Sequence, residues 1–376
     1  MTAAELNRAM LARQLLLERS RMSVVDAVGR VGALQAQQPA SPYVALWNRV
    51  AEFSADALDA AFADRAVVKA SLMRITLHAV TAADYPAFHS TMQFALRASR
   101  LNDRRFREAG LSIDETDALV PGVLEFLSDP RVKGECEAFL ASQVPDRPDR
   151  VWWALRTFAA LHHAPTGGPW SFGQRPSYVA AAPYDPIDDE AALAHLARRY
   201  VEAFGPASGE DLAAFTLIPR PRARAALRDL ELEELEGPDG AVLFDVPGGP
   251  RPSADTPAPP RLMAMWDSVL LAHADRGRLI PPEYRPLVIR RNGDVLPTLM
   301  VDGYVAGVWR PVDDGIEVTA FNRLSRAAWS GVADEARSLL AFLADREPRV
   351  WGRRFDHWWE DLPSATVRVL GRQVRP

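Results

Sequence analysis

The sequence predicts an α+β fold in which tandem winged-helix units, each a helix-turn-helix followed by a wing, precede a small C-terminal antiparallel β-barrel. A pattern of three helices and a two-stranded hairpin occurs three times, and short strands separated by tight turns follow it. The 376 residues also allow several packed units, since single cores rarely grow beyond about 250 residues. The expected units cover residues 1–110, 111–182, 183–250 and 261–376.

The first unit begins with an amphipathic helix and continues into a second helix that has a capping signal. Ser23 precedes Asp26 by three residues, a spacing typical of a helix N-terminus, and Ser54 opens a third helix. Two segments rich in β-branched and apolar residues then predict the strands of a wing. The expected elements are helices at 4–20, 24–34 and 55–63 and strands at 67–73 and 75–80.

The second and third units repeat this order. Ser208 followed by Asp211 is a further capping pair, and Pro238-Asp239-Gly240 predicts the turn of the third wing. In the second unit we expect helices at 115–127, 134–141 and 151–162 and a glycine-rich hairpin at 166–179. In the third we expect helices at 189–204 and 222–230 and a strand at 241–246.

The C-terminal part follows a linker at 246–260 that is rich in proline and glycine. Asn292-Gly293 and Asp302-Gly303 are typical hairpin turns, so the flanking segments should form a small antiparallel sheet or barrel. The expected elements are strands at 287–291, 295–301, 304–309 and 315–321 and a helix at 333–343. Three late tryptophans are expected in the core: Trp351, Trp358 and Trp359.

Composition narrows the class of protein. Hydrophobic residues at 48% and charged residues at 25% are ordinary globular values, which excludes a disordered chain. A single cysteine, Cys136, excludes an internal disulfide and fits a reducing compartment, where we expect it buried. Charged residues interrupt the N-terminal apolar residues, and no apolar run reaches the roughly 18 residues of a membrane span. We therefore expect a soluble, cytoplasmic protein without a membrane partner.

The net charge of −5 argues against a uniformly basic surface, but phosphate contact depends on a local basic face. Arginines are concentrated in two runs, while acidic residues gather elsewhere, as at 229–236. From these runs we predict DNA contacts by Arg104, Arg105, Arg222 and Arg224. The alternative, that both runs are ordinary solvated helix faces, remains open.

Catalytic signatures that depend on a metal or a nucleotide are absent: the sequence has no phosphate-binding loop with lysine, no HExxH and no Cys-x-x-Cys. His162 and His163 fall at the end of an expected helix, where adjacent side chains point to different faces and do not share a ligand. We expect neither a metal nor a cofactor.

A glutamine-rich segment follows the second helix. Pro39 disfavours helical geometry at Gln38, so the chain should be extended by Gln37. In an extended segment residues two apart project to the same side, and Gln35 and Gln37 could then present two amides to one point. An amide can donate to and accept from a water without titrating. A polar loop that only caps the helix is the plainer interpretation.

Several motifs in this chain resemble the winged-helix alkylpurine DNA glycosylases, the AlkZ-like family, over nearly its whole length. The motifs are Leu34-Gln35-Ala36-Gln37, Pro42-Tyr43, Trp47-Asn48-Arg49, Arg74-Ile75-Thr76-Leu77-His78, Trp266-Asp267, His273-Ala274-Asp275-Arg276, Val301-Asp302-Gly303 and Gly307-Val308-Trp309. The resemblance implies tandem winged helices around a β-barrel. It also implies the Gln-x-Gln branch of the family, associated with antibiotic self-resistance, although Ala36 is smaller than the residue usual there.

This resemblance implies a monofunctional DNA glycosylase that hydrolyses the N-glycosidic bond of N7-alkylated purines in duplex DNA, with bulky or crosslinked adducts left open. It assigns the catalytic role to Gln35 and Gln37. Further contacts to the lesion or the water are expected from Gln38, Tyr43, Trp47, Arg74 and His78. A monomer is expected. The alternative function is a non-enzymatic winged-helix DNA-binding regulator, and a helical scaffold for protein partners is a third class.

Overall fold

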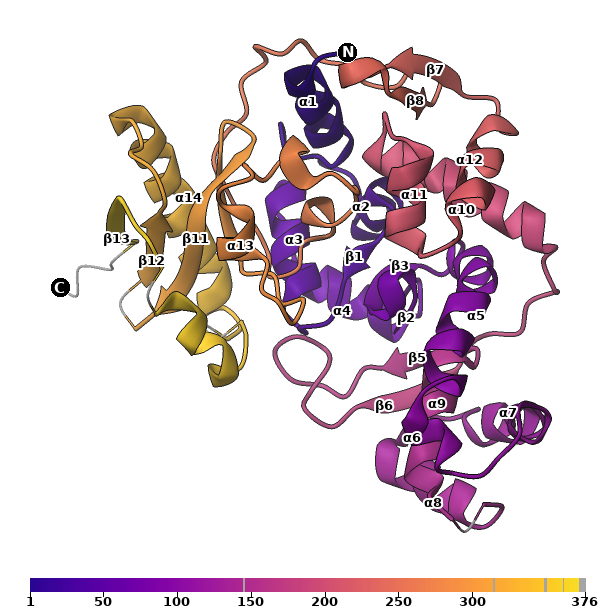
Figure 1. The fold of residues 1–376 in the computed structure, drawn as a ribbon. Helices are drawn as coiled ribbons and strands as arrows, with labels where there is room; N and C mark the ends of the chain where they lie inside the picture. Colours follow the sequence, from indigo (N-terminus) through magenta and orange to yellow (C-terminus); the bar gives the residue numbers. More distant parts are fainter. Residues whose placement is uncertain (145, 314, 348–349, 361, 372–376) are drawn as a thin grey trace.

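The computed structural model describes residues 1–144, 146–313, 315–347, 350–360 and 362–371. A six-stranded sheet lies at the centre, and a five-stranded sheet with a long C-terminal helix lies to one side of it (Figure 1). Helices from the middle of the chain extend away from the central sheet in two directions (Figure 1). No helix among the described residues is long and apolar enough to cross a bilayer.

Two of the N-terminal helices begin at side-chain caps that the sequence predicts. The Ser23 hydroxyl accepts the Asp26 N–H at 3.2 Å, and Ser54 caps the fourth helix in the same way. The second helix stops before Gly32, whose φ of 79° suits glycine and turns the chain into the first strand. The helices are α1 (Ala3–Arg13), α2 (Val24–Val31), α3 (Ser41–Arg49) and α4 (Ala55–Ala63).

The central sheet joins strands from the first and second expected units in the order β1-β3-β2-β5-β6-β4. Its strands are β1 (Leu34–Gln35), β2 (Val67–Ser71), β3 (Leu77–Thr81), β4 (Arg131–Val132), β5 (Leu161–Ala164) and β6 (Ser177–Ala180). The predicted hairpin at 67–80 is confirmed as the antiparallel pair β2 and β3. Because β2 also pairs with β5, the two units share one sheet.

The second hairpin differs from its prediction. The expected helix at 151–162 ends at Phe158, and His162 and His163 lie in β5 instead of at a helix end. The glycine-rich segment predicted as a hairpin is mainly the long connection between β5 and β6. Pairing of β5 with β2 and β6 overrides the local apolar pattern, which does not separate a short buried strand from a helix end.

Helices from the middle of the chain cover the central sheet and extend beyond it. They are α5 (Tyr85–Leu101), α6 (Arg104–Arg107), α7 (Ile113–Phe126), α8 (Lys133–Ala141), α9 (Pro148–Phe158), α10 (Asp189–Phe204), α11 (Gly209–Thr216) and α12 (Arg220–Arg228). The capping pair of Ser208 and Asp211 is confirmed at the start of α11. A two-stranded sheet of β7 (Glu233–Glu236) and β8 (Val242–Asp245) follows. Cys136 is buried, as expected.

The C-terminal strands form an antiparallel sheet in the order β13-β12-β11-β10-β9. They are β9 (Arg261–Leu262), β10 (Thr298–Val301), β11 (Tyr304–Val312), β12 (Gly315–Ala320) and β13 (Thr366–Leu370), and the helices are α13 (Arg285–Val288) and α14 (Arg326–Ala344). Within the described residues no pairing joins β13 to β9, so this sheet is open rather than a closed barrel. The strand predicted at 287–291 is wrong, because α13 with Pro286 in its first turn occupies its beginning.

Two apolar clusters make the core. The first packs α1 to α4 against the C-terminal sheet and α14, so the two ends of the chain share one core. It includes Trp351 and Trp359, whose rings stack at 5.4 Å, and half-buried Trp358 packs against it, which confirms the prediction for these tryptophans. The second cluster joins the central sheet to α5 and to helices α9 to α12.

Candidate active site

Gln35 ends the short edge strand β1, and Gln37 lies two residues beyond it in a bend. Gln35 pairs with His78 across β1 and β3, and the Ala36 N–H donates to the Leu77 carbonyl at 2.7 Å. On the other side the Gln35 N–H donates to the Ser268 hydroxyl at 3.0 Å. The backbone of β1 is therefore fixed between β3 and a segment more than 200 residues later in the sequence.

A cleft of about 400 Å³ opens beside this strand. Its walls come from β1, from the turn between β2 and β3, and from the stretch at 266–294. The residues that line it are Gln35, Gln37, Arg74, Thr76, Trp266, Leu271, Arg276, Ile289, Asn292, Gly293 and Asp294. Both glutamines thus reach the same cleft, as their spacing in an extended segment predicts.

The two amides keep hydrogen-bonding capacity toward the cleft. The Gln35 Oε1 accepts from Arg74, and the Gln37 Oε1 accepts from the Leu77 N–H at 3.4 Å. Each amide oxygen has a second lone pair, and neither amide nitrogen donates to any residue that the structure describes. Gln35 is buried and Gln37 is exposed, so one amide lies in the wall and the other at the mouth.

Arg74 is a largely enclosed cation without a carboxylate partner among the described residues. Its Nη2 donates to the Gln35 Oε1 at 2.6 Å, and its guanidinium lies 5.2 Å from the centre of the Phe215 ring. Its Nη1 is buried and has no hydrogen-bond partner within the described part of the chain. Burial lowers the pKa of Arg74 to about 10, which leaves it charged at neutral pH.

The backbone that aims Arg74 is strained. Arg74 and Ile75 have φ values of 53° and 59°, in the left-handed region that β-branched residues such as isoleucine rarely adopt. Each such residue costs on the order of 1 kcal/mol or more, and strain of this kind persists only where surrounding contacts impose it. The tight turn between β2 and β3 is therefore shaped to hold Arg74 over Gln35.

His78 lies behind Arg74, fully buried. Its Nδ1 lies 3.1 Å from the Thr76 carbonyl and its Nε2 lies 3.4 Å from the Arg74 Nη2. Burial, and to a lesser degree the charge of Arg74, lower the pKa of His78 to about 3. The imidazole is neutral at physiological pH and supports Arg74, and it does not line the cleft.

The other expected lesion contacts lie elsewhere. Tyr43 is buried and donates its hydroxyl to Asp59, away from the cleft. Trp47 is buried beneath the Arg19 guanidinium and against the Phe342 ring. Gln38 is half-buried and does not line the cleft.

Sequence reasoning missed the opposite wall. Trp266, with a φ of 56°, donates its Nε1–H to the Gly293 carbonyl at 2.9 Å and so ties two parts of that wall together. Arg276 lines the same wall. The local sequence at Asn292 and Gly293 indicates only a hairpin turn. A signal for this wall is present, because Trp266 and Arg276 stand in motifs that carry the family resemblance.

A buried ion pair fixes this wall against the first helices. Arg49 donates two hydrogen bonds of 2.8 Å to Asp267, and both side chains are fully buried. Bidentate geometry orients both groups, while removal of one partner would leave an unpaired buried charge. Asp267 directly follows Trp266 and precedes Ser268, so the pair sets the position of both residues that face β1.

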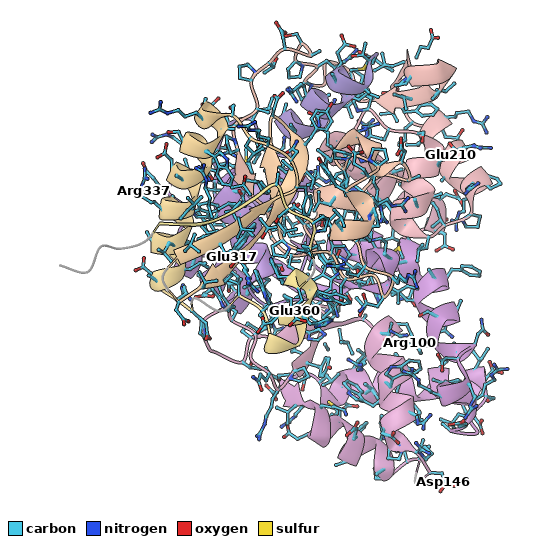
Figure 2. All side chains as sticks on the ribbon, turned by 60° about the vertical axis from the view of Figure 1, so that its left-hand side comes forward. Arg100, Asp146, Glu210, Glu317, Arg337 and Glu360 are labelled. Carbon is cyan, nitrogen blue, oxygen red and sulfur yellow. The ribbon has the colours of Figure 1, made fainter. Side chains whose placement is uncertain are left out.

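The predicted DNA-binding arginines have mostly acidic partners. Arg104 pairs with Glu108 at 2.8 Å, Arg222 pairs with Glu190 at 2.9 Å, and Arg224 pairs with Glu210. The fourth, Arg105, lies 5.3 Å from the centre of the Trp153 ring. Arg100, four residues before Arg104, and Glu210, the partner of Arg224, lie far apart in the molecule (Figure 2).

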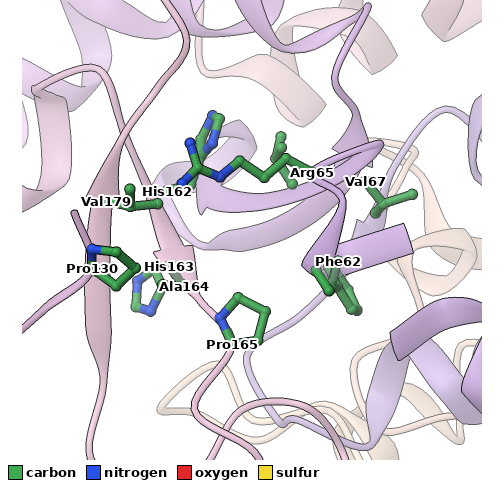
Figure 3. Close-up of a pocket in the computed structure, with 11 residues that line it drawn as sticks. Phe62, Arg65, Val67, Pro130, His162, His163, Ala164, Pro165 and Val179 are labelled. Carbon is green, nitrogen blue, oxygen red and sulfur yellow. The ribbon is translucent and has the colours of Figure 1, made fainter. Parts of the chain in front are cut away.

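The two adjacent histidines line a separate cavity of about 100 Å³ (Figure 3). Burial, and to a lesser degree the charges of His89 and Arg65, lower the pKa of His162 to about 4. The Arg65 side chain reaches across this cavity. Within the described ranges no group of three or more His, Cys, Asp or Glu side chains is placed to hold a metal ion.

Comparison with known proteins identifies the family. A family model described as DNA glycosylase AlkZ-like matches residues 28–342. The interstrand DNA cross-link repair glycosylase of Streptomyces sahachiroi is 28% identical over 345 residues, which are 86% of this chain and 92% of that protein. The solved structure of the Streptomyces sahachiroi DNA glycosylase AlkZ has a TM-score of 0.77 at 23% identity, covering 89% of this chain and 95% of that one, and so has the same fold. Because the family model spans most of its length, this chain belongs to the AlkZ-like DNA glycosylase family.

Proposed function

We propose that this protein is a monofunctional DNA glycosylase that hydrolyses the N-glycosidic bond of N7-alkylated purines in duplex DNA. One observation carries the proposal: Gln35 and Gln37 line a single cleft beside a guanidinium that has no carboxylate partner among the described residues. The relative from Streptomyces sahachiroi is named for interstrand cross-link repair, so bulky and crosslinked purines belong among the substrates to test.

The chemistry suits amides. Alkylation at N7 makes the purine cationic and a good leaving group, so the enzyme has mainly to place a water against the anomeric carbon. Gln35 and Gln37 can each donate to and accept from that water, and their dipoles stabilise the developing oxocarbenium ion. A glycosylase of this design needs no titrating base.

We assign Arg74 a positioning role. Its charge opposes a cationic transition state, so electrostatic stabilisation is not its contribution. Instead, its hydrogen bond to the Gln35 Oε1 fixes which end of that amide faces the cleft. Neutral His78 supports Arg74 from behind.

The amine inventory supports hydrolysis without a covalent intermediate. A lyase-type glycosylase needs an amine for a Schiff base, and the sequence has only Lys69, Lys133 and the N-terminus. Burial lowers the pKa of Lys69 to about 7, but Lys69 packs under the Phe172 ring outside the cleft. Borohydride should therefore trap no enzyme–DNA adduct.

We also propose boundaries for the structural units and residues that contact DNA. Winged-helix units at 1–110, 111–182 and 183–250, with the unit of the open sheet at 261–376, would place the cleft between the first and the last. Arg104, Arg105, Arg222 and Arg224 remain proposed DNA contacts. A non-enzymatic regulator is disfavoured, because the family is enzymatic.

A base-release assay tests the function directly. Duplex DNA that carries N7-methylguanine, and separately a bulky N7 adduct, is incubated with excess protein, and the free base and the abasic site are quantified. We expect release of the alkylated base from at least one substrate, with an intact phosphodiester backbone. Absence of release from both substrates by folded protein contradicts the proposal.

A further inference from the structure

A second cavity, of about 220 Å³, lies among α6, α8 and α9, away from the glutamine cleft. In Figure 1 these helices lie at one end of the molecule, whereas β1 and α13 flank its centre. Eight residues line the cavity: Arg105, Lys133, Glu137, Asp149, Arg150, Trp152, Trp153 and Arg156. Cations outnumber acids in this lining, in a protein with an overall charge of −5.

The two acids are already paired. Glu137 lies 3.2 Å from Lys133, and Asp149 lies 3.6 Å from Arg150 and 3.4 Å from a further arginine, Arg147. Arg105 and Arg156 have no ion-pair partner among the described residues. The surplus charge of the cavity therefore rests on these two guanidiniums.

Neutral groups hold these guanidiniums in place. Two guanidiniums lie over the ring of Trp153: that of Arg100 is 4.5 Å and that of Arg105 is 5.3 Å from the ring centre. Arg156 donates to the Tyr178 hydroxyl at 3.2 Å, which fixes its fork without neutralising it. Guanidiniums that are already held in position lose little conformational entropy when they bind an oxyanion.

A third guanidinium, that of Arg100, lies beside the two in the cavity wall. Burial is the largest cause that lowers the pKa of Arg100; the charges of Arg156 and Arg105 lower it as well, and Asp103 raises it, so both guanidiniums act on Arg100. Trp152, also in the wall, has a buried Nε1–H without a partner in the described part of the chain. No group among the described residues satisfies this N–H or neutralises the two guanidiniums.

We propose that this cavity binds a phosphate group through Arg105 and Arg156, and that the phosphate belongs to the DNA backbone. The DNA source rests on the proposed function, and the geometry requires only the phosphate. Guanidinium forks match phosphate oxygens, and a sequence-independent phosphate contact remote from the cleft would set how the duplex lies on the protein.

The first test measures binding to an undamaged duplex, which does not depend on excision. The dissociation constant is determined against salt concentration for the wild type and for R105Q/R156Q. We expect severalfold weaker binding near 0.1 M salt and a slope of log K against log salt that is smaller by about one, as loss of one phosphate contact implies. R326Q/R337Q removes two exposed charges from α14 and is the matched control, with unchanged slope.

Two further measurements distinguish a lost phosphate contact from a folding defect, and a DNA phosphate from free phosphate. R156K keeps the charge, so its salt slope should stay closer to that of the wild type, whereas a folding defect would lower the melting temperatures of R156K and R105Q/R156Q alike. Inorganic phosphate is titrated calorimetrically into the wild type and into R105Q/R156Q to test free phosphate as the ligand.

Each outcome supports or overturns the inference. A reduced slope in R105Q/R156Q alone supports a DNA phosphate at this site. Phosphate binding that R105Q/R156Q loses, with unchanged DNA slopes, supports a phosphate site but overturns the DNA source. Unchanged slopes without phosphate binding overturn the inference, while base release in the separate assay would leave the proposed function standing.

Discussion

Two groups of arginines in this chain differ in what surrounds them. Arg74 in the cleft contacts an amide, an aromatic ring and a neutral histidine, and no described carboxylate pairs with it. On α12, Arg222 and Arg224 are more exposed, and each pairs with a glutamate of a neighbouring helix. The arginines on α12 stand close together in the sequence and have acidic partners. Arg74 stands alone in the sequence and has no carboxylate partner among the described residues.

The charge that a surface offers to a ligand therefore depends on how its arginines are paired and not on how many stand in a run. An exposed pair is worth little to stability, on the order of 0–1 kcal/mol, and can exchange its acid for a phosphate. A largely buried guanidinium without an acidic partner instead orients the groups to which it donates hydrogen bonds. Substitutions in and around the two groups test this contrast, and we expect the largest effects in the cleft.

The largest effect should come from the glutamines themselves. Q35A and Q37A should each slow single-turnover excision by on the order of 10² or more, because each removes an amide that positions the water. Rates are measured on one N7-alkylguanine duplex with enzyme in excess. Q38A is the matched control and should excise at nearly the wild-type rate, since Gln38 does not line the cleft.

Equal rates for wild type, Q35A and Q37A would overturn the catalytic assignment. A large loss confined to Q38A would move the site by one residue. Melting temperatures near that of the wild type are required for either conclusion.

Arg74 should have the next largest effect. R74Q should lower the saturated excision rate by on the order of tenfold, the equivalent of about 1.5 kcal/mol for a charge-assisted hydrogen bond. Its dissociation constant for DNA should change much less, because the role is to orient Gln35. R74K should recover part of the rate, and R337Q is the surface control.

A purely structural role for Arg74 predicts a different pattern. The melting temperature and the DNA affinity would then fall together with the rate, and R74K would restore none of the three.

The paired arginines on α12 should have a smaller, severalfold effect on DNA affinity. R222E/R224E places like charges beside Glu190 and Glu210 and should weaken binding, with R104E/R105E tested separately. Conversely, E190Q/E210Q frees both arginines and should strengthen binding if α12 faces DNA. Affinity that is the same in R222E/R224E, R104E/R105E and E190Q/E210Q as in the wild type would remove both runs from the interface.

The smallest expected effect is that of pH. Glutamines do not titrate, and the lowered pKa of His78, about 3, keeps its ring neutral well above that value. Single-turnover excision at saturating enzyme should therefore vary little between about pH 6 and 9. A bell-shaped profile, or a slope of one in log rate against pH, would show that a titrating group takes part.

Local patterns in the sequence predicted much of the fold. Ser23 and Ser208 cap helices where their spacing indicates, and the helix expected at 189–204 has those bounds. The two strands expected at 67–73 and 75–80 were also located within a few residues, as β2 and β3. These features depend on neighbours close in sequence, namely capping hydrogen bonds and apolar periodicity.

The same patterns failed where distant contacts decide. His162 joins a strand because β5 pairs with β2 and β6, and the helix at 285–288 overlaps the start of the strand expected at 287–291. Of the lesion contacts that the resemblance implies, Tyr43 and Trp47 lie in packing contacts outside the cleft. The sequence alone does not distinguish a residue that lines the site from one that packs in the core, because the two differ only in their neighbours in space.

By itself the sequence predicted that the chain leaves the helix before Gln37, because proline follows Gln38, and that Gln35 and Gln37 face one side. Both glutamines do line one cleft, although β1 ends at Gln35 and Gln37 lies in a bend. Only the tertiary structure decided what they face. The wall at 266–294, the bond from Arg74 and the pairing of the α12 arginines all join residues far apart in the chain. Such contacts follow from packing of the whole chain, and no local pattern encodes them.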